Sequence, residues 1–227
     1  ALALEDVTTG NHNVAIGYGA GQTQTTASAN VHIGSYAGRL STASYQVAIG
    51  YASMYSATTA TESIAIGQAT LYNTTTGSRN TAIGYSALQL NTTGGQNTAI
   101  GGYAMYANTT ANYGVAVGYQ TLDANTTGAR NCAAGYAAMT TNTTGGYNTA
   151  FGSYALTSQT TPNFNTAVGY QAGYTTSTGY DNTYVGTYAG YSGSGAAKNV
   201  YVGYTAGYYG TGSYNTAVGD TAGDAIT

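Results

Sequence analysis

The sequence predicts an all-β fold, a parallel β-solenoid (β-roll) of thirteen rungs with a 17-residue period. A glycine recurs along the 227 residues, and ten of its twelve steps are 17 residues while two are 16. A short period sustained along a chain is typical of a solenoid, in which each rung buries apolar side chains against its neighbours. Residues 1–227 are therefore expected to form a single continuous array. The repeated glycines are Gly17, Gly34, Gly50, Gly67, Gly84, Gly101, Gly118, Gly135, Gly152, Gly169, Gly186, Gly203 and Gly219.

The residues that lead to each repeated glycine alternate as in a β-strand. In the rung of Gly84, Thr81 and Ile83 point to one side of the strand and Ala82 to the other. Because Ile or Val precedes eleven of the glycines, we expect the Ile/Val side to be the interior. The Ala/Gly side cannot fill space, so we expect it to face a close neighbour in an oligomer. His32 occupies an alanine position and is interpreted as a surface variant.

Two further columns of residues define the rest of the rung. Asparagine stands four residues before the glycine in ten rungs, and we expect these amides to form a hydrogen-bonded ladder, because unpaired buried amides are costly. Leu or Met stands four residues after the glycine in the seven rungs from Met54 to Leu156, and Gly in the other six, which predicts a fuller core in the middle. Polar turns such as Asn-Thr-Thr-Gly-Gly at residues 91–95 then reverse the chain.

Charged residues one rung apart give a test of this register. Glu62 and Arg79 are 17 residues apart in the column before the asparagines, as are Asp181 and Lys198. Both couples are opposite in sign, so we expect each to lie side by side on adjacent rungs.

Composition excludes several classes of function. With four Lys and Arg and a net charge of −3, the chain has no basic surface for nucleic acid. No apolar run is long enough for membrane insertion. Cys132 is the only cysteine and is interpreted as a packing residue. No ionisable groups have the spacing of a catalytic or metal site, so we expect a non-enzyme without a cofactor.

Tyrosine and asparagine provide the candidate surface residues. Aligned tyrosine rings can stack on each other as structural ladders, or they can stack on sugars while their hydroxyls donate hydrogen bonds. The asparagines in Asn-x-Thr sequences are either turn formers or glycosylation acceptors. The candidate surface-binding residues are Tyr51, Tyr85, Tyr119, Tyr136, Tyr170 and Tyr204, and the candidate glycosylation sites are Asn73, Asn91, Asn108, Asn125 and Asn142.

Rungs such as NTAIGYSAL and NTAVGYQAG resemble the repeat region of phage tail-fibre-like proteins. They are also similar to the head of trimeric autotransporter adhesins, whose Asn-Ser-Val-Ala-Ile-Gly motif is closest to residues 13–17 and 46–50 here. The resemblance covers essentially the whole chain. It implies a parallel β-roll that assembles as a trimer and is used for attachment.

These observations predict a structural and adhesive segment of an extracellular fibre, on a virion or a cell surface, that meets a host glycan or receptor through repeated Tyr, Thr and Asn surfaces. The expected assembly is a homo-trimer or homopolymer. Neither end of the sequence looks like a polar cap, which predicts an internal piece of a longer fibre. One alternative is a self-assembling extracellular filament with no receptor. An ice-binding solenoid is less favoured, because the Thr-Thr pairs lie in turns rather than along a strand.

Overall fold

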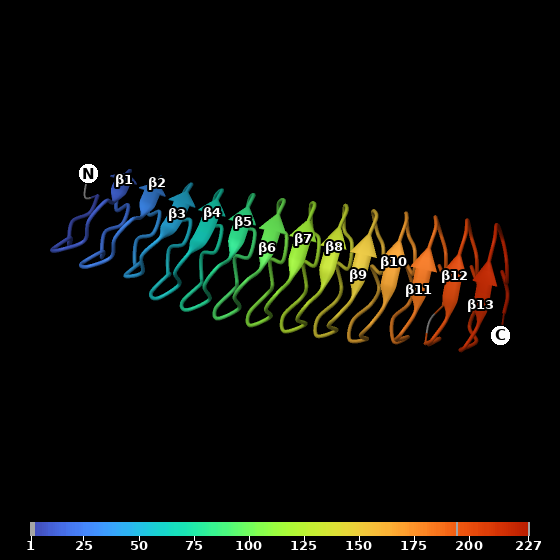
Figure 1. The fold of residues 1–227 in the computed structure, drawn as a ribbon. Helices are drawn as coiled ribbons and strands as arrows, with labels where there is room; N and C mark the ends of the chain where they lie inside the picture. The colour runs from blue at the N-terminus through green and yellow to red at the C-terminus, as the bar shows by residue number, and fades with distance from the viewer. Residues whose placement is uncertain (1–2, 194, 227) are drawn as a thin grey trace. The chain divides into compact units, whose positions relative to one another are not determined.

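The computed structural model describes residues 3–193 and 195–226, which contain thirteen short strands and no helix. The chain divides into two compact units, Ala1–Gly114 and Val115–Thr227, which are built from the same rung (Figure 1). The first unit holds β1 (Val14–Ile16), β2 (Val31–Ile33), β3 (Gln46–Ile49), β4 (Ser63–Ile66), β5 (Thr81–Ile83) and β6 (Thr98–Ile100). The second holds β7 (Val115–Val117), β8 (Cys132–Ala134), β9 (Thr149–Phe151), β10 (Thr166–Val168), β11 (Thr183–Val185), β12 (Val200–Val202) and β13 (Thr216–Val218).

Within each unit the strands are parallel and pair in sequence order, so each rung contributes one strand. Equivalent residues face each other, as Ala82 faces Ala99 between β5 and β6. The two 16-residue steps keep this register, because Val31 still pairs with Val47. The same holds between β12 and β13. The predicted parallel β-solenoid with a period of about 17 residues is confirmed.

The segment after each glycine is bonded to both neighbouring rungs although it is not a strand. Ser86 N donates to Gln68 O of the preceding rung at 3.0 Å, and Leu88 N donates to Ala104 O of the following rung at 3.0 Å. Both residues are in the left-handed region, with φ of 54° and 51°. Such a conformation costs roughly 1–2 kcal/mol for a non-glycine residue, and here hydrogen bonds and burial offset that cost.

The repeated glycine is needed because of its backbone conformation and its close neighbour. Gly84 has a φ of 130°, and a Cβ added to it would lie 2.6 Å from the carbonyl carbon of Gly101. No side chain fits between two backbones at that distance. The glycine column is therefore a backbone-to-backbone contact between rungs.

The interior lies on the opposite side of the strand from the one that the sequence predicted. Ala82 and Ala99 are fully buried, whereas Ile100 is 38% exposed and Val117 40% exposed. The expectation that the Ile/Val side is the core is wrong, and so is the expectation that the alanine side meets another chain. The rung is so thin that a side chain from the second segment, such as the fully buried Leu88, leaves room for only a methyl group at the alanine position.

The end rungs have a full core as well, which corrects the expectation of a fuller middle. In three rungs a large residue replaces the alanine, and a glycine replaces the Leu or Met. Tyr184 and Tyr201 are fully buried, and a Cβ at Gly190 or Gly207 would overlap the respective ring. The volume removed from one column is thus supplied by the other.

The predicted asparagine ladder is confirmed. In the first unit, Asn80 Oδ1 accepts from Asn97 N at 3.0 Å, and its Nδ2 donates to Gly94 O at 2.8 Å. In the second unit, Asn148 makes the corresponding bonds to Asn165 N and to Pro162 O, both at 2.9 Å. These asparagines are buried, so each amide joins one rung to the next.

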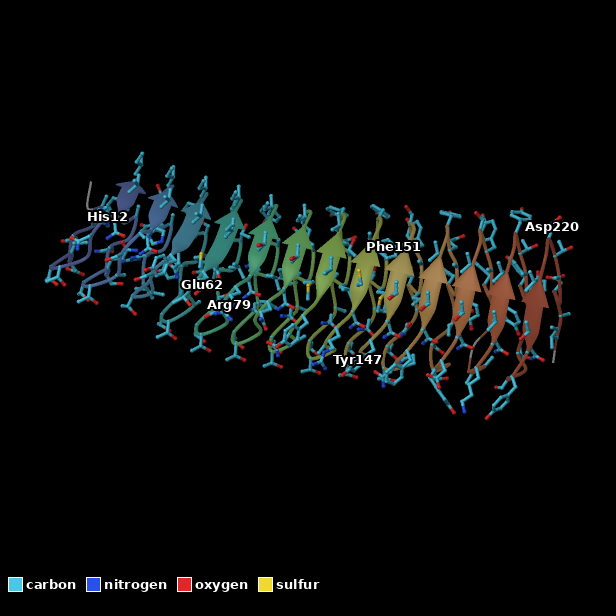
Figure 2. The ribbon with its side chains drawn as sticks, in the orientation of Figure 1. His12, Glu62, Arg79, Tyr147, Phe151 and Asp220 are labelled. Atoms are coloured by element: carbon cyan, nitrogen blue, oxygen red, sulfur yellow. The ribbon has the colours of Figure 1, made fainter. Side chains whose placement is uncertain are left out.

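The charged couples also lie on adjacent rungs, as predicted. Arg79 Nε donates to Glu62 Oε2 at 2.8 Å, and the two residues lie on neighbouring rungs in Figure 2. Asp181 and Lys198 precede the adjacent strands β11 and β12 in equivalent places. Lys198 Nζ, however, points to Tyr214 Oη at 3.5 Å and lies 5.1 Å from the centre of that ring.

Candidate surface-binding site

The six tyrosines proposed from the sequence form an exposed column immediately after the repeated glycines. Their exposed fractions run from 43% at Tyr170 to 56% at Tyr204. The first unit holds Tyr51 and Tyr85, and the second holds Tyr119, Tyr136, Tyr170 and Tyr204. The backbone after each glycine repeats from rung to rung, so these rings are presented at a regular spacing within each unit.

Most rings in this tyrosine column are covered in part by a tyrosine one residue later in the next rung. The centres of the Tyr85 and Tyr103 rings are 5.2 Å apart with planes at 73°, and Tyr136 and Tyr154 are arranged in the same way at 5.3 Å. In such an edge-to-face pair, the edge of one ring lies against the face of the other. The contacts hold the rings in place and reduce the ring face that a ligand can reach.

A second set of tyrosines, five residues after the glycine, stacks face to face. Tyr191 lies between Tyr174 and Tyr208, with ring centres at 5.2 and 4.8 Å and planes within 13° of parallel. In the first unit Tyr55 stacks on Tyr72 at 5.0 Å. The prediction that aligned rings stack on one another is confirmed. Because both faces of Tyr191 are covered, this column presents ring edges and hydroxyls to a ligand.

The threonine-rich turns form another exposed and regular surface. The first threonine of each pair bonds along the column, as Thr92 Oγ1 does to Thr109 O at 3.0 Å. The second threonine, for example Thr93 or Thr110, is exposed. Hydroxyl groups are thereby displayed at the spacing of the rungs.

Sequence reasoning missed the apolar surface of the sheet, because it placed these residues inside. The outer strand columns, which stand one and three residues before the glycine, carry Ile, Val, Thr and Phe toward solvent. In the second unit Phe151 is 44% exposed and Val168 40% exposed; in the first, Ile64 is 38% exposed (Figure 2). The signal that could have located them is the alanine column, which accepts a large residue only where a glycine makes room.

The structure places four of the five candidate glycosylation sites inside the rung. Asn91, Asn108, Asn125 and Asn142 are fully buried, and Asn108 Nδ2 donates to Asn91 Oδ1 at 2.8 Å. A glycan on any of these amides would break the ladder and force the side chain out of the interior. Turn-forming asparagine is thus the interpretation that fits these four. Asn73 lies one position away from this column and is half-buried.

His32 is inside the solenoid, which corrects its interpretation as a surface residue. It is fully buried, with Gln24 Nε2 at 3.2 Å from its Nδ1 and Gln46 Oε1 at 3.2 Å from its Nε2. Burial lowers the pKa of the imidazole to about 4, although the hydrogen bond to Gln46 opposes that shift. Glycine at position 38 provides the room, because a Cβ there would overlap the ring.

The remaining reactive side chains are scattered. The described part of the chain contains no group of three or more His, Cys, Asp and Glu side chains that could hold a metal ion. Cys132 is half-buried, and burial raises the pKa of its thiol. Across the residues that the structure describes, no helix has the length and apolar character needed to cross a bilayer.

No family model, no curated protein and no solved structure matches this chain. The arrangement of its own side chains is therefore the basis for a functional proposal.

Proposed function

We propose that the chain is a structural and adhesive segment of an extracellular fibre that binds a host surface or glycan through many weak contacts. The observation that carries the proposal is the regular exposure of tyrosine and threonine side chains, such as Tyr85 and Thr93, at the spacing of the rungs. Repeated weak contacts along one rigid body give avidity without a deep pocket. The scarcity of Lys and Arg, four in 227 residues, leaves few sites for trypsin-like proteases outside a cell.

Association of several copies is part of this proposal, but through a different surface from the alanine side. The outer strand columns are apolar, and fractions of about two fifths of Ile100, Val117 and Val168 are exposed. Only 5% of the chain is charged, so little charge keeps neighbouring copies apart. A homo-trimer or homopolymer would remove this apolar surface from water, which is favourable at roughly 25 cal/mol per Å².

Adhesion is tested by measuring how the full chain binds to cells and to glycan-coated surfaces. A variant with all six residues of the tyrosine column changed to alanine should lose most of its binding, whereas Tyr85→Ala alone should lose little, as avidity requires. Circular dichroism verifies that both variants are folded. Full binding by the six-residue variant, or no binding by the unchanged chain, would refute an adhesive role.

Association is tested by the mass in solution of the unchanged chain and of the double variant Ile100→Glu with Val168→Glu. These side chains point outward, so the variant should stay folded and become monomeric. In contrast, Ala99→Glu should prevent folding, because Ala99 is fully buried. A monomeric unchanged chain would contradict the proposed assembly.

A self-assembling filament without a receptor is the second candidate, and the apolar outer columns favour it. The same two measurements separate the candidates. Association without any binding to cells or glycans supports the filament, whereas binding that depends on the tyrosine column supports the adhesive segment.

A further inference from the structure

The two 16-residue rungs share a feature that the other rungs lack. In each, the turn is one residue shorter, and it has a matching sequence: Thr-Ala-Ser-Tyr-Gln at 42–46 and Thr-Gly-Ser-Tyr-Asn at 211–215. Both turns carry a very exposed tyrosine, with Tyr45 65% and Tyr214 75% exposed. The shortening therefore coincides with a particular side-chain arrangement, once in each unit.

The missing residue leaves a gap in the ridge of exposed threonines. Thr26 and Thr59, in the rungs before and after, are both exposed, and the rung between them goes directly from Thr42 to Ala43. An open hollow of about 410 Å³ lies at this place. Its volume falls in the range of about 300–1,000 Å³ that is usual for small-ligand sites. It is lined by Thr42, Ala43, Ser44, Tyr45, Thr59, Thr61 and Glu62.

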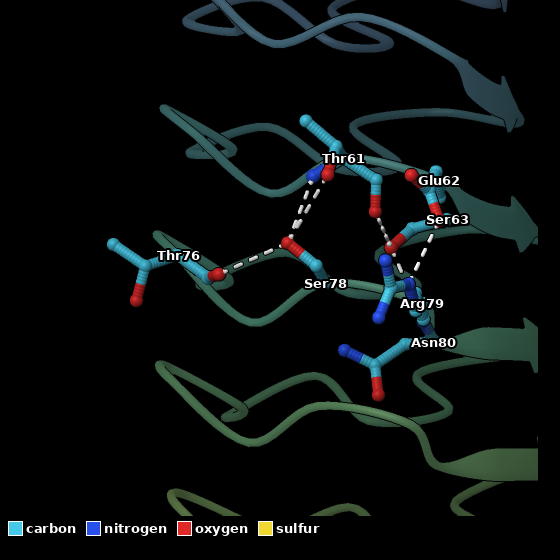
Figure 3. A network of polar contacts seen from close by, with 7 residues as sticks. All are labelled: Thr61, Glu62, Ser63, Thr76, Ser78, Arg79 and Asn80. Carbon is cyan, nitrogen blue, oxygen red and sulfur yellow. Dashed lines mark hydrogen bonds and ion pairs between the residues drawn. The ribbon is translucent and has the colours of Figure 1, made fainter.

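The lining combines one aromatic ring with polar groups. The Tyr45 ring contacts no other aromatic ring among the residues that the structure describes, unlike the stacked tyrosines. Glu62 is held by Arg79 through Oε2, and Figure 3 shows its other oxygen turned away from that arginine. Thr61 belongs to the same network through Ser78 Oγ, which accepts from Thr61 N at 3.1 Å (Figure 3). The polar groups of the hollow are thus positioned by the following rungs.

We propose that this hollow at residues 42–46 and 59–62 is a binding site for a neutral saccharide; the proposal rests on the adhesive function proposed above. The accessible face of Tyr45 stacks on the C–H face of a sugar ring, and the oxygens of Thr59 and Glu62 accept hydrogen bonds from its hydroxyls. Tyr45 is the only large apolar group in the lining, which disfavours a purely apolar ligand. The Glu62 carboxylate disfavours an anionic one.

The second shortened turn is not assigned the same role. Lys198 lies over the Tyr214 ring, with Nζ 5.1 Å from its centre, so that face is occupied. Tyr214 shares the short turn without an accessible ring face on the Lys198 side, which makes it a control within the chain.

The site is tested by titrating the full chain with the methyl glycosides of glucose, galactose and mannose and following the Tyr45 ring signals by NMR. We expect at least one of these sugars to bind weakly, and Tyr45→Ala to weaken that binding by about tenfold, the upper range of one aromatic contact. Tyr113→Ala is the matched control. Tyr113 stands in the same column of a full-length rung, is 51% exposed and has a φ of 60°, close to the 62° of Tyr45.

A second variant tests the origin of the hollow. Inserting one threonine between Thr42 and Ala43 restores the 17-residue turn, and it should fill the gap and abolish sugar binding while the chain stays folded. Binding that survives this insertion, or that falls equally in Tyr45→Ala and Tyr113→Ala, would overturn the proposal, as would the absence of Tyr45-dependent shifts with all three sugars.

Adhesion measured on the same variants separates this site from the wider proposal. If the chain adheres to cells but none of the sugars shifts Tyr45, the saccharide site fails and the adhesive function stands. If the chain neither adheres nor binds a sugar, both proposals fail.

Discussion

The rung of β5 encloses Ala82 and Leu88, whereas the rung of β11 encloses Tyr184 and Gly190, and both interiors are fully buried. In the first rung the volume comes from the segment after the repeated glycine, and in the second it comes from the strand. The comparison teaches that the rung conserves the summed volume of the two columns and not the residue in either one. Protein interiors are close-packed, so the two columns must change together.

The largest effect is expected when the strand residue of the β11 rung is removed. Tyr184→Ala leaves a cavity opposite Gly190 and should lower the free energy of unfolding by about 3–5 kcal/mol, as for other large aromatic truncations. Chemical denaturation measures this loss. Adding Gly190→Leu recreates the β5 arrangement and should restore most of the stability. A double variant no more stable than the single one would break the comparison.

The β2 rung fills its strand position with His32, which makes its interior sensitive to acid. Burial lowers the pKa of His32 to about 4, below its usual value of 6.5. Between these values the unfolded chain binds a proton and the folded chain does not, so stability falls as the pH drops from about 6.5 to about 4 and then levels off. The shift corresponds to about 3 kcal/mol. The difference between denaturation curves of the unchanged chain and His32→Gln, taken across this pH range, should show the loss only in the former.

The reverse exchange in the β5 rung should have a smaller effect. Ala82→Tyr overfills an interior that already holds Leu88, and overpacking typically costs about 1–3 kcal/mol. The further change Leu88→Gly should recover stability by copying the β11 rung. Ile83→Tyr, one residue along on the outer side, is the control and should change the stability by less than about 0.5 kcal/mol. Equal losses for Ala82→Tyr and Ile83→Tyr would show that the interior is assigned to the wrong side.

The smallest effect is expected at the surface pair of Glu62 and Arg79. Both side chains are more than half exposed, and exposed ion pairs contribute little to stability. Arg79→Gln should leave the denaturation midpoint unchanged within error, at low and at high salt. A clear, salt-dependent shift would mean that this pair supports the fold more than its exposure indicates.

The sequence was sufficient to predict the period, the strand positions and the asparagine ladder, because each of these depends on spacing alone. A column of identical residues at a fixed period has to meet itself on the next rung, as Asn97 meets Asn80. The side of the strand that faces inward does not follow from spacing. Ile83 is more apolar than Ala82, but the interior admits only the smaller residue, since Leu88 already fills it.

The candidate site was visible in the sequence only as an irregularity. The step of 16 residues between Gly34 and Gly50 shows that one residue is missing, but not from which part of the rung. Because the strands stay in register, the loss falls on the turn before Tyr45, and the hollow follows from that placement. Ring orientation was also out of reach, since stacked and edge-to-face tyrosines have the same spacing in the chain.

The asparagine ladder also gives the folding reaction a direction. Asn80 uses both ends of its amide on residues of the following rung, Asn97 N and Gly94 O, and Asn148 does the same with Asn165 N and Pro162 O. Each rung is therefore completed by the rung that leaves the ribosome after it. The partners are only 14 to 17 residues away, so the loop that must close is short and closes quickly. We expect the array to grow one rung at a time from the N-terminal side, with the newest rung always the least protected against hydrogen exchange.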